Sequence, residues 1–593
     1  MSDRFSTSRR EFLQTAAAPL AAGGRRTGRT RPNILLILSD DQGWGDLSAH
    51  GNPLLATPNL DRLAGEGVEF MRFHVSPVCA PTRASLLTGR YHLRCGVHGV
   101  TGGRETMRAG EVTLAEALRP AGYRTALFGK WHLGENYPYV PHARGFEEFV
   151  GFRTGHWYDY WDPKFERNGK PHQLKGYVTE ALTGEAMRYI DGHRSEPFFL
   201  YMAYNVPHSP FQVPERYWAR FRDLAGVTRE TAAAYALTAC LDDQVGRLLQ
   251  HLEERKLAED TIVIFLGDNG PNTDRYTGGL RGRKGSVYEG GTRSALCVRW
   301  PGRLTAGKKV DRIAAHIDLF PTLLDLAGVE RPKGPTLDGV SLRPLLEGDG
   351  RAWPERMLFT HGEPAKNPGA QYPGAVRTQR FNLVNGRELY DVAADPGESK
   401  NVAAEHPEQA AELKAAYEKW FADVMRPHGL EHFPIPVGYA EENPAVLTAT
   451  QAKLEGQVRY FQGAGWAHDW ASGWTAVGDG MSWDLDVVKP GEYEIQLTVL
   501  CPPEAVGTRL SVQVGAVEAV ECAVEQQSPG GPVVMRDVVP RKEAPVMNWA
   551  ERRVGVVRLP AGRMPARLRC VAGEGKPGFG VYAMSLRRLN SRS

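Results

Sequence analysis

Three unbroken apolar segments are the feature that most constrains the fold of this 593-residue chain. They span residues 33–38, 198–202 and 261–266, and each has the length of one strand. A strand whose interior positions are all apolar buries both of its faces, which is typical of a parallel sheet. Residues 112–118 and 231–255, between these segments, carry apolar side chains at helical spacing. The alternation predicts an α/β domain over residues 32–356, with helices on both faces of the sheet.

The pattern changes after residue 356. Strand-like runs at residues 375–377, 381–384 and 388–390 include an Asn385-Gly386 hairpin signal, and a helix is expected at 407–424. These features predict a small antiparallel subdomain over residues 357–426. Residues 427–444 are rich in proline and glycine and are interpreted as a linker.

Residues 445–593 contain short alternating segments separated by turn signals, which predicts a separate all-β sandwich. Appended sandwiches of this kind resemble carbohydrate-binding modules. Two interpretations stay open, a glycan-binding module and a structural cap without a ligand. Either interpretation fits the tryptophans of this region, as sugar platforms or as core residues: Trp466, Trp470 and Trp474.

Charge and cysteine content exclude several classes of protein. The 72 basic and 69 acidic residues leave a net charge of +3, and no long basic run occurs, so we expect no nucleic-acid partner. No apolar run reaches membrane-spanning length, so no stable membrane insertion is expected. Seven cysteines without a CxxC pair argue against a structural zinc site or a disulfide scaffold. One bridge among Cys501, Cys522 and Cys570 stays open.

The N-terminal segment, residues 1–31, resembles a twin-arginine export signal. Arg9 and Arg10 precede an apolar pair and then an alanine-rich stretch at residues 15–22. The alternative is a disordered basic leader. The resemblance implies export by the twin-arginine machinery to the periplasm or the cell exterior, after folding and any modification inside the cell.

Polar side chains follow two of the apolar strands. Asp40 and Asp41 come after the first strand, and Asp268 and Asn269 come after the strand at residues 261–266. The carboxyl ends of strands in such a sheet gather at one edge, so these groups are expected to meet. Hard oxygen ligands of this kind suit calcium or magnesium. The Asp242-Asp243 pair lies within a predicted helix and is interpreted as structural.

Three further motifs lie near strand ends. They are GKWHLG with Lys130 and His132, NVPHSP with His208, and the glycine-rich loop at residues 280–293 with Lys284. Each has an ordinary alternative, as a solvated lysine, a hydrogen-bonded histidine or a simple loop. Together with the carboxylates they predict a cationic pocket around a metal ion, suited to a tetrahedral oxyanion ester.

Residues 78–90, VCAPTRASLLTGR, place Cys79 four residues before Arg83 with no evident histidine base. This stretch, with DDQG, GKWHLG, VPHSP, GDNG and RGRKGSVYEGGTR, resembles the sulfatase family, arylsulfatase-like members of the alkaline-phosphatase-like superfamily. The resemblance covers residues 32–424 and includes ELYDVAADPGESKNVA in the antiparallel subdomain. It implies a mixed, mostly parallel sheet flanked by helices.

The resemblance implies that Cys79 is oxidised to formylglycine by a formylglycine-generating enzyme. The hydrated aldehyde would attack the sulfur of a sulfate monoester, expel the alcohol, and release sulfate as the resulting hemiacetal breaks down. Asp40, Asp41, Asp268 and Asn269 would bind calcium, in preference to magnesium, together with residue 79. The metal would polarise the sulfate and lower the pKa of the attacking hydroxyl.

The same resemblance implies roles for five further side chains. Arg83 would hold the formylglycine hydrate, and Lys130 and Lys284 would bind sulfate oxygens. His208 would act at the leaving oxygen, and His132 would be the base for hemiacetal breakdown.

Substrate identity is less constrained. The aromatic run at residues 156–161 either stacks on a sugar or an aryl ring, or packs a loop. Export and a possible carbohydrate module favour sulfated carbohydrates over other sulfated small molecules. A phosphate or phosphonate ester hydrolase of the same superfamily is the alternative. A glycan-binding protein with an immature catalytic site, in which Cys79 stays a thiol, is a third interpretation.

Overall fold

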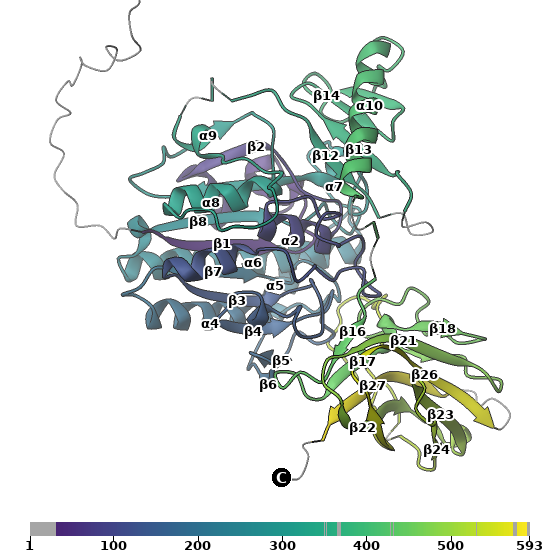
Figure 1. Ribbon diagram of the computed structural model, residues 1–593. Coiled ribbons are helices and arrows are strands. Elements are labelled where there is room, and N and C mark those ends of the chain that lie inside the picture. Colours follow the sequence, from purple (N-terminus) through teal and green to yellow (C-terminus); the bar gives the residue numbers. More distant parts are fainter. Residues whose placement is uncertain are drawn as a thin grey trace, which may run out of the picture.

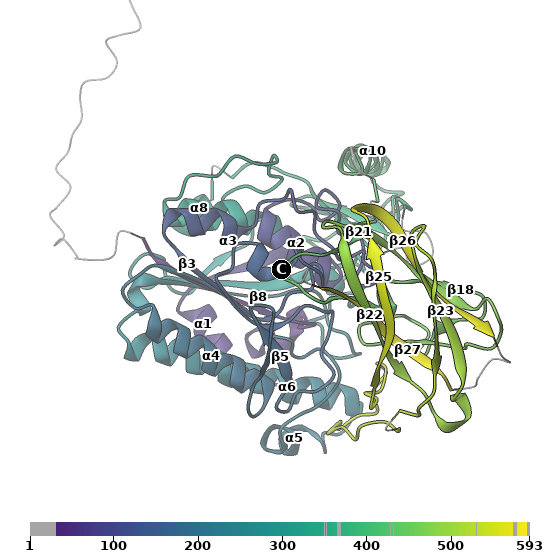
Figure 2. The same ribbon diagram turned by 60° about the horizontal axis from the view of Figure 1, so that its bottom comes forward.

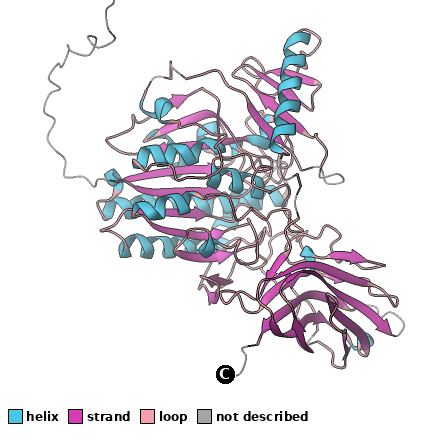
Figure 3. Cartoon of the chain, viewed as in Figure 1, coloured by secondary structure: helices cyan, strands magenta, loops and turns pink. Residues whose placement is uncertain are grey.

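The computed structural model describes residues 31–348, 350–351, 353–363, 369–426, 429–430, 432–528, 530–572 and 578–589. The predicted export leader therefore lies outside the described residues, except for Arg31. An α/β body, a small antiparallel subdomain and a β-sandwich follow one another along the chain (Figure 1, Figure 3). Within the described residues, no helix combines the length and the apolar character needed to cross a membrane.

The α/β body is built on a mixed sheet of eleven strands. The strand order is β10-β2-β9-β8-β1-β7-β3-β4-β5-β6, with β11 also paired to β2. The strands are β1 (Asn33–Ser39), β2 (Val68–His74), β3 (Arg124–Lys130), β4 (Glu148–Phe152), β5 (Lys164–Arg167), β6 (Lys170–Gln173), β7 (Phe198–Ala203), β8 (Thr261–Gly267), β9 (Arg293–Arg299), β10 (Lys308–Val310) and β11 (Ala314–Ala315).

The three apolar segments of the sequence form the centre of this sheet, as predicted. β1 pairs in parallel with β7 on one side and β8 on the other, and every residue of all three strands is buried. β3 pairs in parallel with β7 and β4, whereas β9 is antiparallel to β2 and β8. The carboxyl ends of the central parallel strands therefore meet at one edge.

Helices cover both faces of the sheet, because alternate residues of the central strands are apolar on both sides (Figure 2). On β1, Leu35 and Ile37 join one core with α1, α4, α5 and α6, whereas Ile34 and Leu36 join a second core with α2, α3, α8 and α9. The helices of this body are α1 (Pro58–Gly65), α2 (Cys79–Thr88), α3 (Leu114–Leu118), α4 (Val178–Gly192), α5 (Glu215–Phe221), α6 (Arg229–Glu254), α7 (Glu289–Thr292), α8 (Leu319–Ala327) and α9 (Arg343–Glu347).

The predicted antiparallel subdomain is present as a four-stranded sheet packed against one helix. Its elements are β12 (Leu358–His361), β13 (Gly374–Arg377), β14 (Phe381–Val384), β15 (Glu388–Asp391) and α10 (Pro407–Val424). Residues 385–387 join β14 to β15, and the backbone N–H of Arg387 donates to the carbonyl oxygen of Val384 at 3.1 Å. Asn385 and Gly386, the central residues of this turn, both have positive φ, at 52° and 66°. The hairpin signal is confirmed, because a tight hairpin of this type requires positive φ at both central residues.

The C-terminal region is a sandwich of two six-stranded sheets around a single apolar core. One sheet contains β16 (Ile435–Val437), β18 (Lys453–Glu455), β21 (Gly480–Val487), β23 (Thr508–Val514), β24 (Val520–Val524) and β26 (Gly562–Ala572). The other contains β17 (Ala445–Thr448), β19 (Arg459–Tyr460), β20 (Ala471–Ser472), β22 (Gly491–Leu500), β25 (Ala550–Leu559) and β27 (Gly580–Arg588).

Three sequence interpretations of this region are corrected or resolved. The interpretation of residues 427–444 as a linker is wrong for β16, which pairs in parallel with β21 and buries Ile435 and Val437. Trp470 and Trp474 belong to the buried interior, whereas Trp466 is 45% exposed. None of the seven cysteines is in a disulfide, so the bridge considered among the last three is not formed.

Candidate active site

The ends of β1 and β8 bring four polar side chains together, as the sequence predicts. Asp40 and Asp41 follow β1, and Asp268 and Asn269 follow β8, and all four are buried. The backbone N–H of Asp41 donates to Asp268 Oδ1 at 3.0 Å. Asn269 Nδ2 donates to Asp41 Oδ1 at 2.8 Å. Adjacent parallel strands thus deliver three carboxyl groups and one amide to one position.

Helix α2 places Cys79 and Arg83 beside these side chains. Cys79 is the first residue of α2 and is only 3% exposed. One turn later, Arg83 Nη2 donates to Asp268 Oδ2 at 2.9 Å, and Arg83 Nη1 donates to the carbonyl oxygen of Lys130 at 3.0 Å. The buried guanidinium therefore ties α2 to the ends of β8 and β3.

Two lysines neutralise the aspartates at the end of β1. Lys130 Nζ donates to Asp40 Oδ2 at 2.7 Å, and Lys284 Nζ lies 2.6 Å from Asp41 Oδ1. Burial alone would raise the pKa of both aspartates. The combined positive charges around them, led by Lys130 at Asp40 and by Lys284 at Asp41, outweigh burial and lower both pKa values. Both aspartates are therefore ionised.

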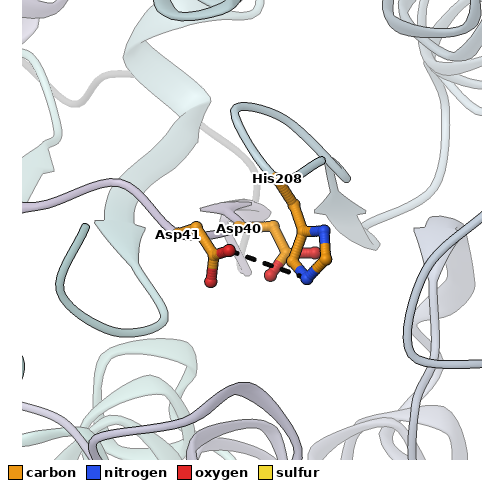
Figure 4. A group of neighbouring side chains, drawn as sticks. All are labelled: Asp40, Asp41 and His208. Atoms are coloured by element: carbon orange, nitrogen blue, oxygen red, sulfur yellow. Dashed lines mark ion pairs between the residues drawn. The ribbon is translucent and has the colours of Figure 1, made fainter. Parts of the chain in front are cut away.

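The two predicted histidines lie at the same site. His208 Nε2 faces Asp41 Oδ2 at 3.6 Å, and the two side chains point toward one another (Figure 4). His132 Nε2 lies 2.8 Å from the carbonyl oxygen of Val100. A carbonyl oxygen can only accept, so Nε2 carries the proton and Nδ1 is the basic nitrogen of this ring. Burial, and after it the charge of Lys130, holds the pKa of His132 well below its ordinary value, so the ring is neutral.

Several oxygens at this site have no hydrogen-bond partner among the described residues. They are Asp40 Oδ1, Asp41 Oδ2 and Asn269 Oδ1, all fully buried. Ligand atoms of Asp40, Asp41 and His208 lie within 4.8 Å of one another, as do those of Asp40, Cys79 and Asp268. Buried oxygens are normally satisfied, so these groups fit a hard divalent cation such as calcium or magnesium.

Asp41 has a strained backbone, and Arg275 holds it in place. Its φ of 65° lies in the left-handed region, which is unfavourable for a residue with a side chain. Arg275 Nη2 donates to the carbonyl oxygen of Asp41 at 2.5 Å and to Asp46 Oδ2 at 2.8 Å. Sequence reasoning missed Arg275, since it lies in a loop with no motif that links it to Asp41.

Replacing Arg275 with alanine is expected to lower the free energy of unfolding by about 3–5 kcal/mol, because Asp46 would remain buried without its partner. Turnover should fall as well, since Asp41 would lose the contact that fixes its carbonyl. Urea denaturation and steady-state kinetics measure the two effects. Arg387→Ala is the control, because that side chain is 77% exposed, and it should change stability by less than about 0.5 kcal/mol. An unchanged unfolding curve for Arg275→Ala would contradict the assigned role.

A cavity of about 520 Å³ opens onto this cluster. Five of the predicted residues line it: Asp41, Cys79, His132, His208 and Lys284. The other predicted residues lie behind this surface, in a hydrogen-bonded cluster that reaches it through Asp41: Asp40, Arg83, Lys130, Asp268 and Asn269. All the predicted site residues are thus brought together.

The aromatic run at residues 156–161 contributes to the cavity mainly through its first residue. His156 lines the cavity. Trp157 packs against Phe152 and Phe165, with ring centroids 5.5 and 5.2 Å apart, so the following rings mostly pack the loop. Sandwich residues at positions 466–467 and 540–543 also line the cavity, and of these sequence reasoning considered only Trp466.

Comparison with known proteins identifies the family. Residues 32–329, about half of the chain, match the Sulfatase family. The chain belongs to the sulfatase family. Residues 283–424 also match the family described as N-sulphoglucosamine sulphohydrolase, C-terminal, which takes in the antiparallel subdomain. The protein is therefore a sulfatase, an enzyme that hydrolyses sulfate esters.

Individual relatives of the chain support the same family assignment. Human arylsulfatase A is 35% identical to this sulfatase over 443 residues, which cover 67% of the chain and 83% of the human protein. N-acetylgalactosamine-6-sulfatase of Canis lupus familiaris is 33% identical over 383 residues, which cover 58% of this chain and 70% of the relative. The crystal structure of Ps i-CgsB in complex with k-i-k-neocarrahexaose has a TM-score of 0.62 at 28% identity, covering 68% of this chain and 95% of that one.

The architecture of this sulfatase confirms the predicted alkaline-phosphatase-like fold, a mixed and mostly parallel sheet with helices on both faces. Both family matches end by residue 424. The β-sandwich of this sulfatase therefore lies outside the region that the two families describe.

Proposed function

We propose that this sulfatase hydrolyses sulfate monoesters of carbohydrates, with a nucleophile derived from Cys79. The observation that carries the proposal is the position of Cys79, at the first turn of buried helix α2 and on the wall of the cavity. The N-terminus of a helix favours negative charge, which suits an oxyanion held at this point. Lys130 and Lys284 add positive charge beside it.

The surroundings of Cys79 do not favour thiol catalysis. Burial raises the pKa of its thiol, and the charges of Lys130 and Lys284 only partly offset this. Among the described residues, no histidine hydrogen-bonds to Cys79 to serve as its base. Oxidation of Cys79 to formylglycine by a modifying enzyme would supply a hydrated aldehyde, whose oxygen is the nucleophile. This interpretation removes the need for a thiolate.

Asp40, Asp41, Asp268 and Asn269 would hold a calcium ion together with residue 79. The burial of all four, and the oxygens of Asp40, Asp41 and Asn269 that lack a hydrogen-bond partner, support this assignment. When bound, the ion supplies Lewis-acid polarisation of the sulfate and a lower pKa for the attacking hydroxyl. Arg83, one turn from residue 79, hydrogen-bonds to Asp268 and so fixes the start of α2 against the end of β8.

The remaining side chains bind the sulfate and move protons. Lys130 and Lys284 would bind sulfate oxygens through charge-assisted hydrogen bonds; Lys284 lines the cavity, and Lys130 lies behind its wall beside Asp40. His208 lines the cavity and would donate to the leaving oxygen. His132 has a basic Nδ1 without a hydrogen-bond partner among the described residues and would accept the proton released as sulfate leaves.

A sulfated carbohydrate is the proposed substrate class. N-acetylgalactosamine-6-sulfatase and the neocarrahexaose complex of Ps i-CgsB associate related proteins with sugars. The cavity of about 520 Å³ is within the range of sites for small organic ligands.

The deciding experiment compares turnover of 4-nitrophenyl sulfate with turnover of aryl phosphate mono- and diesters. We expect the sulfate ester to have the higher kcat/KM. Mass spectrometry of the peptide that contains Cys79 should show the aldehyde in active protein. Faster phosphoester turnover would favour the phosphate or phosphonate hydrolase. A thiol at residue 79 in protein that lacks sulfatase activity would show that the catalytic site is immature.

Export is proposed as part of this function. Arg9 and Arg10, followed by the alanine-rich stretch, support passage through the twin-arginine machinery to the periplasm or beyond. That route carries folded proteins, which allows the formylglycine-generating enzyme to act on Cys79 first, inside the cell.

A further inference from the structure

The sandwich lies against one end of the α/β body, and two of its loops reach the catalytic cavity (Figure 1, Figure 2). The first connects β19 to β20 and contributes Trp466 and Ala467. The second, between β24 and β25, spans residues 525–549 and contributes Pro540, Arg541, Lys542 and Glu543. The wall of the cavity is therefore shared between the two domains.

Specific contacts hold the longer loop against the α/β body. The backbone N–H of Val538 donates to the carbonyl oxygen of Phe211 at 2.9 Å. Gln212 Nε2 donates to Asp537 Oδ1 at 3.0 Å, and Val539 is buried in the core of the α/β body. The loop is thus seated on the segment that follows His208, and its position is defined by packing as well as by polar contacts.

The shorter loop is fixed in the same way. Thr101 Oγ1 donates to the carbonyl oxygen of Gly465 at 2.6 Å, directly before Trp466. His468 Nε2 lies 3.0 Å from the carbonyl oxygen of His156, which itself lines the cavity. Trp466 is therefore held at the cavity by its neighbours on both sides.

Trp466 differs from the two tryptophans that follow it in the sequence. Trp470, in the same loop, and Trp474, just after β20, are 2% and 1% exposed, whereas Trp466 is 45% exposed and lines the cavity. Exposing a large aromatic ring costs free energy that packing would recover, and such a ring at a cavity is suited to bind an apolar surface. A pyranose ring has an apolar face of C–H groups that can stack on it.

Two residues of the longer loop, Arg541 and Glu543, line the same cavity as Trp466. Arg541 Nη1 and Glu543 Oε2 are buried and have no hydrogen-bond partner among the described residues. The other Arg541 nitrogens pair with Asp537, and Glu543 Oε1 accepts from Ser209 Oγ. A free donor and a free acceptor on residues that share a cavity with an aromatic ring match the hydroxyl groups of a sugar, which both donate and accept.

We propose that the sandwich supplies a second sugar-binding subsite of the catalytic cavity, so that this sulfatase acts on sulfated oligosaccharides. The unit next to the sulfated sugar stacks on Trp466, and Arg541 and Glu543 hydrogen-bond to its hydroxyls. This inference rests on the proposed function, since it assumes that the ester being cleaved belongs to a carbohydrate. It makes the sandwich a part of the active site, neither a remote binding module nor a cap.

The test measures how much a second sugar contributes to kcat/KM. N-acetylgalactosamine 6-sulfate and sulfated galactose are each assayed as free monosaccharides and as the terminal unit of an oligosaccharide from the same polymer. For the sugar that is hydrolysed, we expect the oligosaccharide to have the higher kcat/KM. Trp466→Ala should lower kcat/KM on the oligosaccharide by about fivefold to tenfold relative to the monosaccharide, mostly through a higher KM.

Three further variants separate recognition from folding. Trp466→Phe keeps an aromatic face and should retain most of the gain. Glu543→Gln keeps the acceptor for Ser209 but changes the charge at the unpartnered oxygen, and should reduce the gain in kcat/KM that the second sugar gives. Val477→Ala alters a side chain that is 62% exposed and is not part of the cavity, so it should leave every substrate unchanged.

The outcomes distinguish this inference from the proposed function. If no sulfate ester of any size is hydrolysed by protein that carries the aldehyde, the proposed function fails, and this inference fails with it. If sulfate esters are hydrolysed but the wild type has the same kcat/KM on the oligosaccharide as on the monosaccharide, only the subsite is overturned. An equal loss on monosaccharide and oligosaccharide in Trp466→Ala, with no rescue by Trp466→Phe, would also overturn it.

Discussion

Replacing Cys79 with alanine is expected to reduce sulfate-ester turnover by about 10⁴-fold or more, as removal of a nucleophile does in other enzymes. Alanine cannot be oxidised to an aldehyde, so the attacking oxygen would be lost. The side chain removed is small and nearly fully buried at the start of α2, so the fold should persist. Initial rates on 4-nitrophenyl sulfate, with a thermal melt to confirm folding, measure the effect.

Cys79→Ser tests whether turnover requires the second hydroxyl of the hydrated aldehyde. A serine hydroxyl could attack sulfur once, but it has no second hydroxyl with which to expel sulfate. We therefore expect a burst of 4-nitrophenol that does not exceed one molecule per enzyme, followed by no turnover. Cys522→Ala, at a partly buried cysteine of the sandwich, is the matched control and should keep full activity. Full activity in Cys79→Ala would exclude this residue as the nucleophile.

Much of the fold could be predicted because its core depends on local patterns. The central strands β1, β7 and β8 are apolar at their interior positions and buried along their whole length, which only a fully covered sheet can accommodate. Helix α10 was predicted with the bounds that the structure shows, and α6 differs from its prediction by a few residues. Asp242, interpreted as structural, accepts from the backbone N–H of Leu60 at 2.8 Å, at the start of α1.

The candidate site was predictable for a related reason. Asp41 and Asn269 are far apart in sequence, yet both directly follow strands that the apolar pattern identifies as interior. Once two such strands are parallel neighbours, their carboxyl ends must coincide, and the side chains that follow them meet. Lys130 and His208 were found in the same way, since they lie at or just after the ends of β3 and β7.

Contacts made by docking between distant segments could not be predicted. Arg275 reaches Asp41 only because its loop folds back over the end of β1. No periodic pattern in the sequence predicts this contact. Arg541 and Glu543 reach the cavity because a whole sandwich docks on the α/β body. The prolines and glycines of residues 427–444 indicated a linker, but three residues in that segment pair with β21 when the sandwich folds.

Removing the proposed calcium ion with a chelator is expected to reduce turnover on the order of 10³-fold, since Lewis-acid stabilisation is worth several kcal/mol. Stability should also depend on the ion, because the site gathers three buried carboxyl groups. Burial, and after it the charge of Asp40, raises the pKa of Asp268 to about 7. A divalent cation offsets this repulsion, and saturation at about 100 times Kd adds about 2.7 kcal/mol of stability.

The metal test therefore has two readouts, turnover and melting temperature, measured in chelated protein as calcium or magnesium is returned. We expect calcium to restore both. Asp41→Asn should weaken the response of the melting temperature, because it removes one carboxylate from the site. Asp223→Asn is the matched control, since that side chain is 88% exposed, and it should respond like the wild type. Better restoration by magnesium would overturn the choice of calcium, and full activity with no thermal response after chelation would overturn the metal site itself.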